Sequence, residues 1–134
     1  MEQESGSRTD RRKGRMMRIY VAGAMSADNI LDVLGNISEG IKIGAQLLQK
    51  GYAPFVPHFD VFFKIQQGKD YNVPMTYYYD YTMEWLKASD AVVVVPGWEN
   101  STGTKNEIAK ANEMGIPVYF NLEDLYREHG EYDV

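Results

Sequence analysis

The feature that most constrains the fold of this chain is the apolar segment Ala91–Pro96. It consists of alanine, four valines in succession and proline, and Asp90 precedes it. A short β-branched run with no polar alternation is typical of a strand that is covered on both faces, as in parallel sheets. A strand of that kind needs helices on both sides, so the segment predicts an α/β protein.

The rest of the sequence alternates β-rich and amphipathic segments around this strand. We expect strands at 16–23, 53–56, 90–96 and 116–120, and helices at 36–50, 74–88, 105–114 and 122–129. Asn36 is the expected N-cap of the first helix, because Glu39 follows three residues later. The aromatic-rich segment His58–Val73 is expected to be a long functional loop. This alternation predicts parallel strands joined by right-handed crossovers.

Length and charge set the organisation of the chain and exclude several partners. The 134 residues suffice for one domain, and we expect a disordered basic tail over 1–16 and a folded domain over 17–134. Residues 18–134 carry 16 acidic and nine basic side chains, and this acidic body disfavours polymeric nucleic acid. Cysteine is absent, and no apolar run approaches the roughly 20 residues of a membrane span. We expect a cytoplasmic protein without membrane contact.

Polar residues that follow strands are the first candidates for a site, since ligands of parallel sheets bind at the carboxyl ends of strands. The clearest group is Pro96–Glu107, where a buried strand leads through a Gly/Ser/Thr/Asn turn into a helix. Backbone N–H groups and hydroxyls at that helix start could hold an anion. Glu107 would lie near this pocket, where the helix dipole favours the ionised form that a nucleophile needs. The alternative is that Glu107 is only a favourable charge near a helix start.

Other residues could complete such a site. The Tyr20 phenol could donate a hydrogen bond to a carboxylate in the same cleft, or Tyr20 could simply pack in the sheet. Asp80 shares a helix face with Glu84 and could act as a general acid, although such a pair is more often a solvated face. His58 follows a strand and could contact a ligand. No metal-ligand spacing, Walker lysine motif or G-x-G-x-x-G is present, so we expect no metal and no cofactor.

Several of these motifs together resemble the nucleoside 2-deoxyribosyltransferase-like superfamily, which includes 2′-deoxynucleoside 5′-phosphate N-hydrolases. The resemblance covers about residues 17–121. It rests on Ile19–Gly23, on Pro57-His58, on Glu84-Trp85-Leu86 leading to Asp90–Val93, and on Ser101-x-Gly103-x-x-x-Glu107 with Ala111. It implies a flavodoxin-like or Rossmann-like three-layer sandwich with a four- to five-stranded parallel sheet. It also implies a homodimer or higher homo-oligomer.

The resemblance further implies an enzyme that cleaves or transfers the N-glycosidic bond of a 2′-deoxynucleoside or its 5′-monophosphate through a covalent glycosyl-Glu intermediate. Its nucleophile falls on Glu107 and its helper tyrosine on Tyr20. The family's general acid falls on Thr82, so Asp80 is the nearest substitute. The expected substrate-binding residues are Gly23, Ser26, His58, Trp98, Ser101 and Gly103.

Two departures and two alternatives accompany this interpretation. The phosphate-holding Ser and Arg of the nucleotide hydrolases fall on Ala24 and Ser26, which leaves phosphate binding open. Phe59, Phe62, Tyr71 and Trp98 could stack on a base or pack as a lid. The alternatives are a non-catalytic nucleotide-binding or sensing module of the same fold, and a ribonucleotide phosphoribohydrolase, whose glycine-rich loop matches less well at Trp98.

Overall fold

A four-stranded parallel sheet forms the centre of the protein. The computed structural model describes residues 9–10, 14–70 and 72–130. The strands are β3 (Arg18–Ala22), β4 (Ala53–Phe55), β5 (Ala91–Val94) and β6 (Val118–Tyr119), in the order β4-β3-β5-β6. Neighbouring strands pair in parallel, with Tyr20 opposite both Phe55 and Val92. The chain order therefore reverses between β3 and β5, which is the switch point of a doubly wound sheet.

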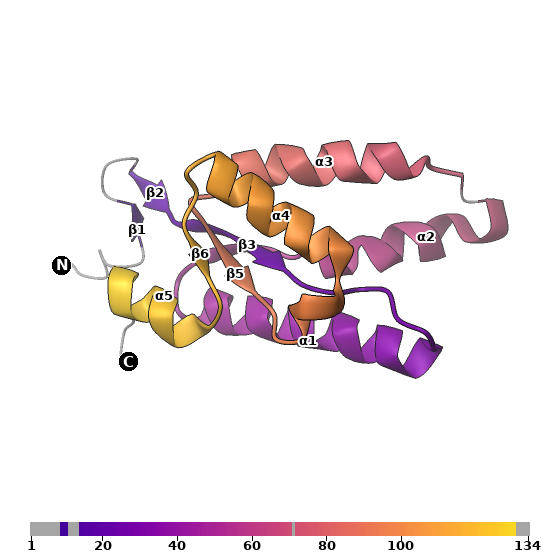
Figure 1. Ribbon diagram of the computed structural model, residues 1–134, viewed down its shortest axis with the longest axis horizontal. Helices are drawn as coiled ribbons and strands as arrows, with labels where there is room; N and C mark the ends of the chain where they lie inside the picture. The colour runs from indigo at the N-terminus through magenta and orange to yellow at the C-terminus, as the bar shows by residue number, and fades with distance from the viewer. Residues whose placement is uncertain (1–8, 11–13, 71, 131–134) are drawn as a thin grey trace.

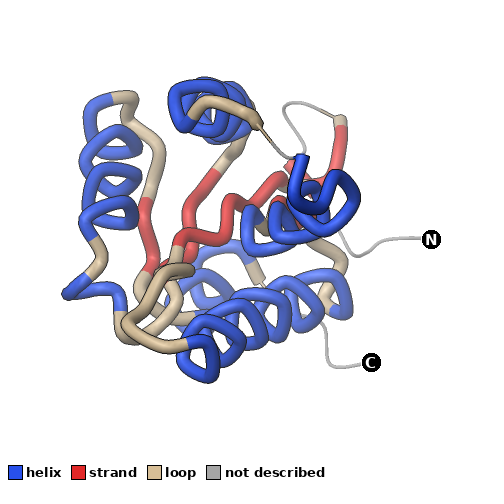
Figure 2. Tube along the Cα trace, turned by 90° about the vertical axis from the view of Figure 1, so that its right-hand side faces the viewer, coloured by secondary structure: helices blue, strands red, loops and turns tan. Residues whose placement is uncertain are grey.

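Helices cover both faces of the sheet (Figures 1 and 2). They are α1 (Ile30–Gln49), α2 (Val61–Gln67), α3 (Met75–Lys87), α4 (Thr102–Glu113) and α5 (Leu122–His129). Short 3-10 segments stand at η2 (Pro57–Asp60), η3 (Gly68–Asp70) and η4 (Trp98–Asn100). This arrangement confirms the predicted three-layer α/β sandwich with a parallel sheet.

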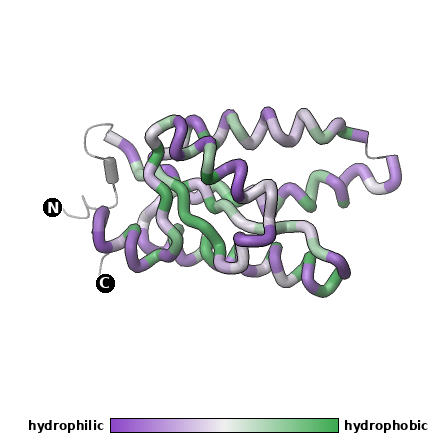
Figure 3. The backbone as a smooth tube through the Cα atoms, in the orientation of Figure 1, coloured by the Kyte–Doolittle hydropathy of each residue, from purple (hydrophilic) through white to green (hydrophobic). Residues whose placement is uncertain are grey.

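Strand alternation divides the core into two clusters. Ile19, Val21 and Val93 face one side and pack with Leu47 of α1 and Leu125 of α5. The opposite side of the same strands packs against α3 and α4, through Tyr20, Ala22, Val92, Val94, Met83, Leu86 and Ala111. Successive side chains point to opposite faces of a strand, so a fully apolar strand must be covered twice. Figure 3 shows the hydrophobic residues concentrated along the central strands.

Two expected elements differ from the structure. The first helix begins at Ile30 rather than 36, because Asn29 is its N-cap and its side chain accepts a hydrogen bond from the Asp32 backbone N–H. Asn36 lies inside this helix. The expected loop 58–73 is instead largely helical, since η2, α2 and η3 occupy residues 57–70. The sequence of this segment lacks a clear helical period. Of the three short helices, η2 is the one with buried residues, namely Pro57, His58 and Asp60.

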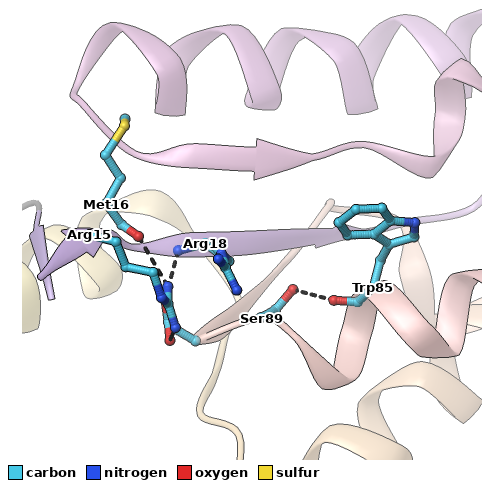
Figure 4. Close-up of polar contacts among 6 residues, drawn as sticks. Arg15, Met16, Arg18, Trp85 and Ser89 are labelled. Atoms are coloured by element: carbon cyan, nitrogen blue, oxygen red, sulfur yellow. Dashed lines mark hydrogen bonds and ion pairs between the residues drawn. The ribbon is translucent and has the colours of Figure 1, made fainter. Parts of the chain in front are cut away.

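Regular structure also precedes residue 17. The short strands β1 (Thr9–Asp10) and β2 (Arg15–Met16) pair antiparallel. Arg15 makes two hydrogen bonds to the carboxylate of Asp90, of 2.8 and 3.1 Å, and the same carboxylate accepts the Arg18 N–H (Figure 4). In the same view Ser89 donates to the Trp85 carbonyl at the end of α3. The rest of the expected tail, 1–8 and 11–13, lies outside the described residues.

Candidate functional site

A cavity of about 1060 Å³ opens at the carboxyl ends of β3 and β5. Residues that follow the strands form its floor, among them Gly23, His58 and Ser101. The helices α2 and α3, together with the N-terminal half of α1, extend past this end of the sheet and supply the walls of the cavity (Figure 1). The cavity therefore lies at the switch point between β3 and β5, where doubly wound sheets bind their ligands. Its volume suits a small organic ligand.

Tyr20 and Glu107 meet at the floor of this cavity. Tyr20 lies on the face of β3 that is covered by α3 and α4, and its side chain is fully buried. Glu107 lies on the stripe of α4 that faces the sheet, between the buried Thr104 and Ala111. The Tyr20 hydroxyl donates a hydrogen bond of 2.5 Å to Glu107 Oε2. This bond fixes the orientation of the carboxylate, whose residue lines the cavity.

The protonation of Glu107 differs from the expectation based on the helix dipole. Burial raises the pKa of Glu107 to about 7, and the hydrogen bond from Tyr20 opposes this shift only in part. Glu107 lies in the second turn of α4, and the helix dipole falls off within the first turn. Desolvation therefore outweighs the dipole, and the carboxylate titrates near neutral pH. Burial and the neighbouring Glu107 raise the pKa of the Tyr20 phenol, which stays a donor.

His58 reaches the cavity from η2 and is almost completely buried, with 1% of its surface exposed. Burial lowers the pKa of His58 to about 4, so the ring is neutral at physiological pH. Neither ring nitrogen meets a partner with good hydrogen-bond geometry in the part of the chain that the structure describes. A backbone hydrogen bond at Ala24 opposes this shift of the His58 pKa, and the ring lines the cavity.

A second buried carboxyl group lies on the same 3-10 segment. Asp60 is 7% exposed and lines the cavity. The Tyr81 hydroxyl of α3 donates a hydrogen bond of 2.6 Å to Asp60 Oδ1. Burial raises the pKa of Asp60, and the bond from Tyr81 and the charge of Lys64 oppose that shift. Glu107 and Asp60 thus bring two carboxyl groups with raised pKa values to one cavity, each held by a tyrosine.

Hydroxyl groups from the start of α4 itself cap this end of the helix. Ser101 is the N-cap, and its Oγ accepts the backbone N–H of Thr104 at 3.2 Å. The hydroxyls of Ser101 and Thr104 also share a hydrogen bond of 2.8 Å. This capping explains the Ser101-x-x-Thr104 spacing. Ser101 and Gly103 line the cavity as expected.

The structure brings most of the expected residues together, but it leaves two outside. Gly23, Ser26, His58, Ser101, Gly103 and Glu107 line the cavity, and Tyr20 supports Glu107 from behind. Asp80 is exposed on α3 and is not part of the cavity lining. Trp98 also stays outside the lining, because its ring packs against Phe120 with centroids 5.3 Å apart.

Sequence reasoning gave no role to Asp60, and it left two roles open for the aromatic residues. Asp60 falls in the segment Pro57–Asp60 after the second strand, so its position was a usable signal. Phe59 and Phe62 are exposed, stack on each other and do not line the cavity, and Tyr71 lies outside the described residues. The aromatic residues that do line the cavity are Tyr78 and Tyr79, together with the hydroxyl residue Thr82.

The described part of the chain has neither a metal-binding cluster nor a membrane-spanning helix. Within residues 9–10, 14–70 and 72–130, no group of three or more histidine or carboxylate side chains could hold a metal ion. No helix in the same ranges combines the length and apolar character needed to cross a membrane.

Comparisons with known proteins give a family and a fold. A family model described as a domain of unknown function, DUF4406, matches residues 17–120. A solved structure of a 2-deoxyribosyltransferase from the psychrotolerant bacterium Bacillus psychrosaccharolyticus is similar, with a TM-score of 0.52 and 19% sequence identity. The similarity covers 75% of this chain and 69% of that one. It confirms the expected likeness to the deoxyribosyltransferase fold. No curated protein sequence matches this chain.

Proposed function

The chain belongs to the DUF4406 family, a domain of unknown function, and we propose that it breaks the N-glycosidic bond of 2′-deoxynucleosides. The released sugar passes to water or to a second base. The observation that carries this proposal is the hydrogen bond of 2.5 Å between Tyr20 and Glu107 at the floor of the cavity. The deoxyribosyltransferase fold of the structural relative supports it.

The proposed reaction is a double displacement at C1′ of the sugar. The Glu107 carboxylate attacks C1′ while the bond to the base breaks and its electron pair leaves with the base nitrogen. Tyr20 holds Glu107 in one orientation during this attack. Water or a second base then attacks C1′ and releases Glu107. Tyr78 and Tyr79 on the cavity wall would stack on the base, and the buried ring of His58 would bind the ligand.

The charge of the cavity favours a nucleoside over its 5′-monophosphate. Among the described residues, the lining carries one lysine, Lys64, and four carboxyl groups, those of Asp28, Asp32, Asp60 and Glu107. The ring of His58, which also lines the cavity, is neutral. Even with a proton on Asp60, carboxyl groups outnumber cations in this lining, so a phosphate dianion would be repelled, whereas an uncharged deoxyribose would not. We therefore propose the free 2′-deoxynucleoside as substrate, and the monophosphate as a poor one.

The test is a substrate panel analysed by chromatography for free base. The protein is incubated with the four 2′-deoxynucleosides, their 5′-monophosphates and the matching ribonucleosides, with and without a second free base. We expect release or exchange of base from at least one deoxynucleoside, and loss of that activity in Glu107→Gln. The matched control Glu113→Gln changes an exposed glutamate on the same helix, paired with Lys110, and should keep full activity.

Three results would contradict the proposal or parts of it. Binding of deoxynucleosides without turnover would favour the non-catalytic sensing module. Base release that persists in Glu107→Gln would remove the glutamate from the mechanism. Faster cleavage of monophosphates or ribonucleotides would overturn the assigned substrate class.

We also propose that the protein assembles as a homodimer. The start of α1 and the helix α2 expose large apolar side chains: Ile30, Leu31, Leu34, Phe62 and Ile65, each more than half exposed. Contiguous exposed apolar patches commonly mark an interface, and we propose that these side chains form one. Sedimentation should give the mass of a dimer, and Leu31→Glu should convert it to a monomer. A monomeric wild type at micromolar concentration would disprove this assembly.

A further inference from the structure

The cavity contains a second carboxyl group to which the sequence analysis gave no role. Asp60 is buried, and one of its oxygens, Oδ1, accepts the Tyr81 hydroxyl at 2.6 Å. The residue still belongs to the cavity lining, as does Glu107. Asp60 and Glu107 are thus two carboxyl groups on different elements, η2 and α4, that line one cavity.

We propose that Asp60, held by Tyr81, is the general acid that delivers a proton to the departing base. This inference rests on the proposed function, because it assigns a second role within the same site. Asp80 is exposed and lies outside the lining. Thr82 lines the cavity, but a hydroxyl group is too weak an acid for this step, and its Oγ1 already bonds to the Tyr78 and Tyr79 carbonyls.

The surroundings of Asp60 suit a proton donor. Burial raises its pKa, which favours the protonated form, while Lys64 on α2 and Tyr81 on α3 lower it and keep the proton transferable. Tyr20 on β3 donates its hydrogen bond to the other carboxyl group, that of Glu107. In the reactive state that we propose, Asp60 carries the proton and Glu107 carries the negative charge.

The proton and electron pairs balance over the two steps. In the first step the C1′–N bond breaks, its electron pair goes to the base nitrogen, the proton of Asp60 moves to that base, and a Glu107–C1′ bond forms. In the second step a water oxygen attacks C1′, its proton returns to Asp60, and the Glu107 carboxylate leaves. When a second base is the acceptor, its N–H proton returns to Asp60 in place of that of water.

The test compares a substrate that needs a proton with one that does not. The base of 7-methyl-2′-deoxyguanosine is already cationic and leaves as a neutral molecule, whereas that of 2′-deoxyguanosine or 2′-deoxyadenosine needs a proton on departure. We expect Asp60→Asn to slow the unmodified deoxynucleosides by about 100-fold or more and to slow 7-methyl-2′-deoxyguanosine by less than about tenfold. Glu107→Gln should abolish cleavage of both kinds, and Glu84→Gln, an exposed change on α3, should affect neither.

A pH profile supplies a readout that a merely structural role would not change. Wild-type kcat/KM should decline at high pH as Asp60 loses its proton, and Asp60→Asn should lack this alkaline decline. Tyr81→Phe removes a bond that lowers the pKa of Asp60, so its alkaline decline should move to higher pH. The amide introduced by Asp60→Asn can still accept the Tyr81 hydroxyl, and thermal unfolding of each variant checks the fold.

The two proposals fail in distinguishable ways. A wild-type protein that cleaves no substrate of the panel overturns the proposed function, and the role of Asp60 with it. An active wild type whose folded Asp60→Asn variant loses the same factor on both kinds of substrate overturns the role of Asp60 alone. The role of Asp60 would also be overturned if Asp80→Asn lost activity while Asp60→Asn kept it.

Discussion

The ring of His58 occupies the space that a side chain at Gly40 would need. A Cβ at position 40 would lie 2.3 Å from His58 Cγ, far inside van der Waals contact. Gly40 is in the interior of α1, where glycine is otherwise unfavourable. The glycine thus lets α1 approach η2 closely, and this approach holds the buried imidazole at the cavity.

Substituting this glycine should destabilise the protein. Gly40→Ala would force the buried ring to move, and we expect a loss of about 1–3 kcal/mol of unfolding free energy in urea titrations. Gly35→Ala, in the same helix with nothing within 4 Å of its Cβ, should instead be neutral or stabilise by up to about 1 kcal/mol. In the background of His58→Ala the cost of Gly40→Ala should shrink. Equal effects at 35 and 40 would contradict the packing argument.

Removing the Tyr20 hydroxyl should change the pH dependence of activity. The hydrogen bond from Tyr20 lowers the pKa of Glu107, which burial raises to about 7. In Tyr20→Phe that pKa rises further, so the pH at which Glu107 becomes ionised should increase and activity at pH 7 should fall. The measurement is kcat/KM against pH for base release. Tyr119→Phe removes a hydroxyl that bonds to Glu128 instead, and an equal shift in this control would disprove the explanation.

Glu107 should cost stability at alkaline pH. Its folded pKa of about 7 lies above the unfolded value of 4.5, so the folded state binds more protons between these values. The stability of the wild type therefore decreases as the pH rises through this window. Glu107→Gln lacks this loss, and at pH 8 it should be more stable than the wild type by roughly 3 kcal/mol. The gap should narrow below pH 5 in parallel denaturation curves, and a pH-independent gap would contradict the assignment.

The ion pair of Arg15 should matter for stability, although it lies in the segment expected to be a tail. Its two bonds reach a carboxylate whose side chain is only 5% exposed. We expect Arg15→Ala to reduce the unfolding free energy by about 1–2 kcal/mol. Arg127→Ala breaks an ion pair between exposed side chains on one helix and should cost less than about 0.5 kcal/mol. A negligible effect of Arg15→Ala in urea would restore the tail interpretation for this residue.

Local sequence signals predicted most of the secondary structure. The helix Leu122–His129 has the predicted bounds, and the valine run forms the central strand β5. The predicted start of α1 was wrong because Asn29 and Asn36 offer similar capping signals, and the side chain of Asn29 is the one that caps the helix. The helices within 57–70 were missed because segments of three to seven residues have little intrinsic helical preference.

The residues of the candidate site also divide into those that local spacing predicted and those that only the tertiary structure placed. The spacing Ser101-x-Gly103-x-x-x-Glu107, through the family that it resembles, was sufficient to select Glu107 as a nucleophile candidate. The role of Ser101 as N-cap was not predicted, because the helix was expected to begin at 105 and begins at Thr102. The second acid could not be chosen from spacing. Asp80 and Asp60 both come before Thr82 in the sequence, and only the packing of η2 against α1 and α3 brings Asp60 into the cavity and leaves Asp80 in solvent.

The sequence by itself determined the layers of this protein, because a run of valines without polar alternation is stable only between two helical layers. It also determined which strand end would carry the candidate nucleophile. Only the tertiary structure decided which side chains share the cavity and in which protonation state. Burial is a property of the assembled core, and the desolvation it imposes on Glu107, Asp60 and His58 sets their charges.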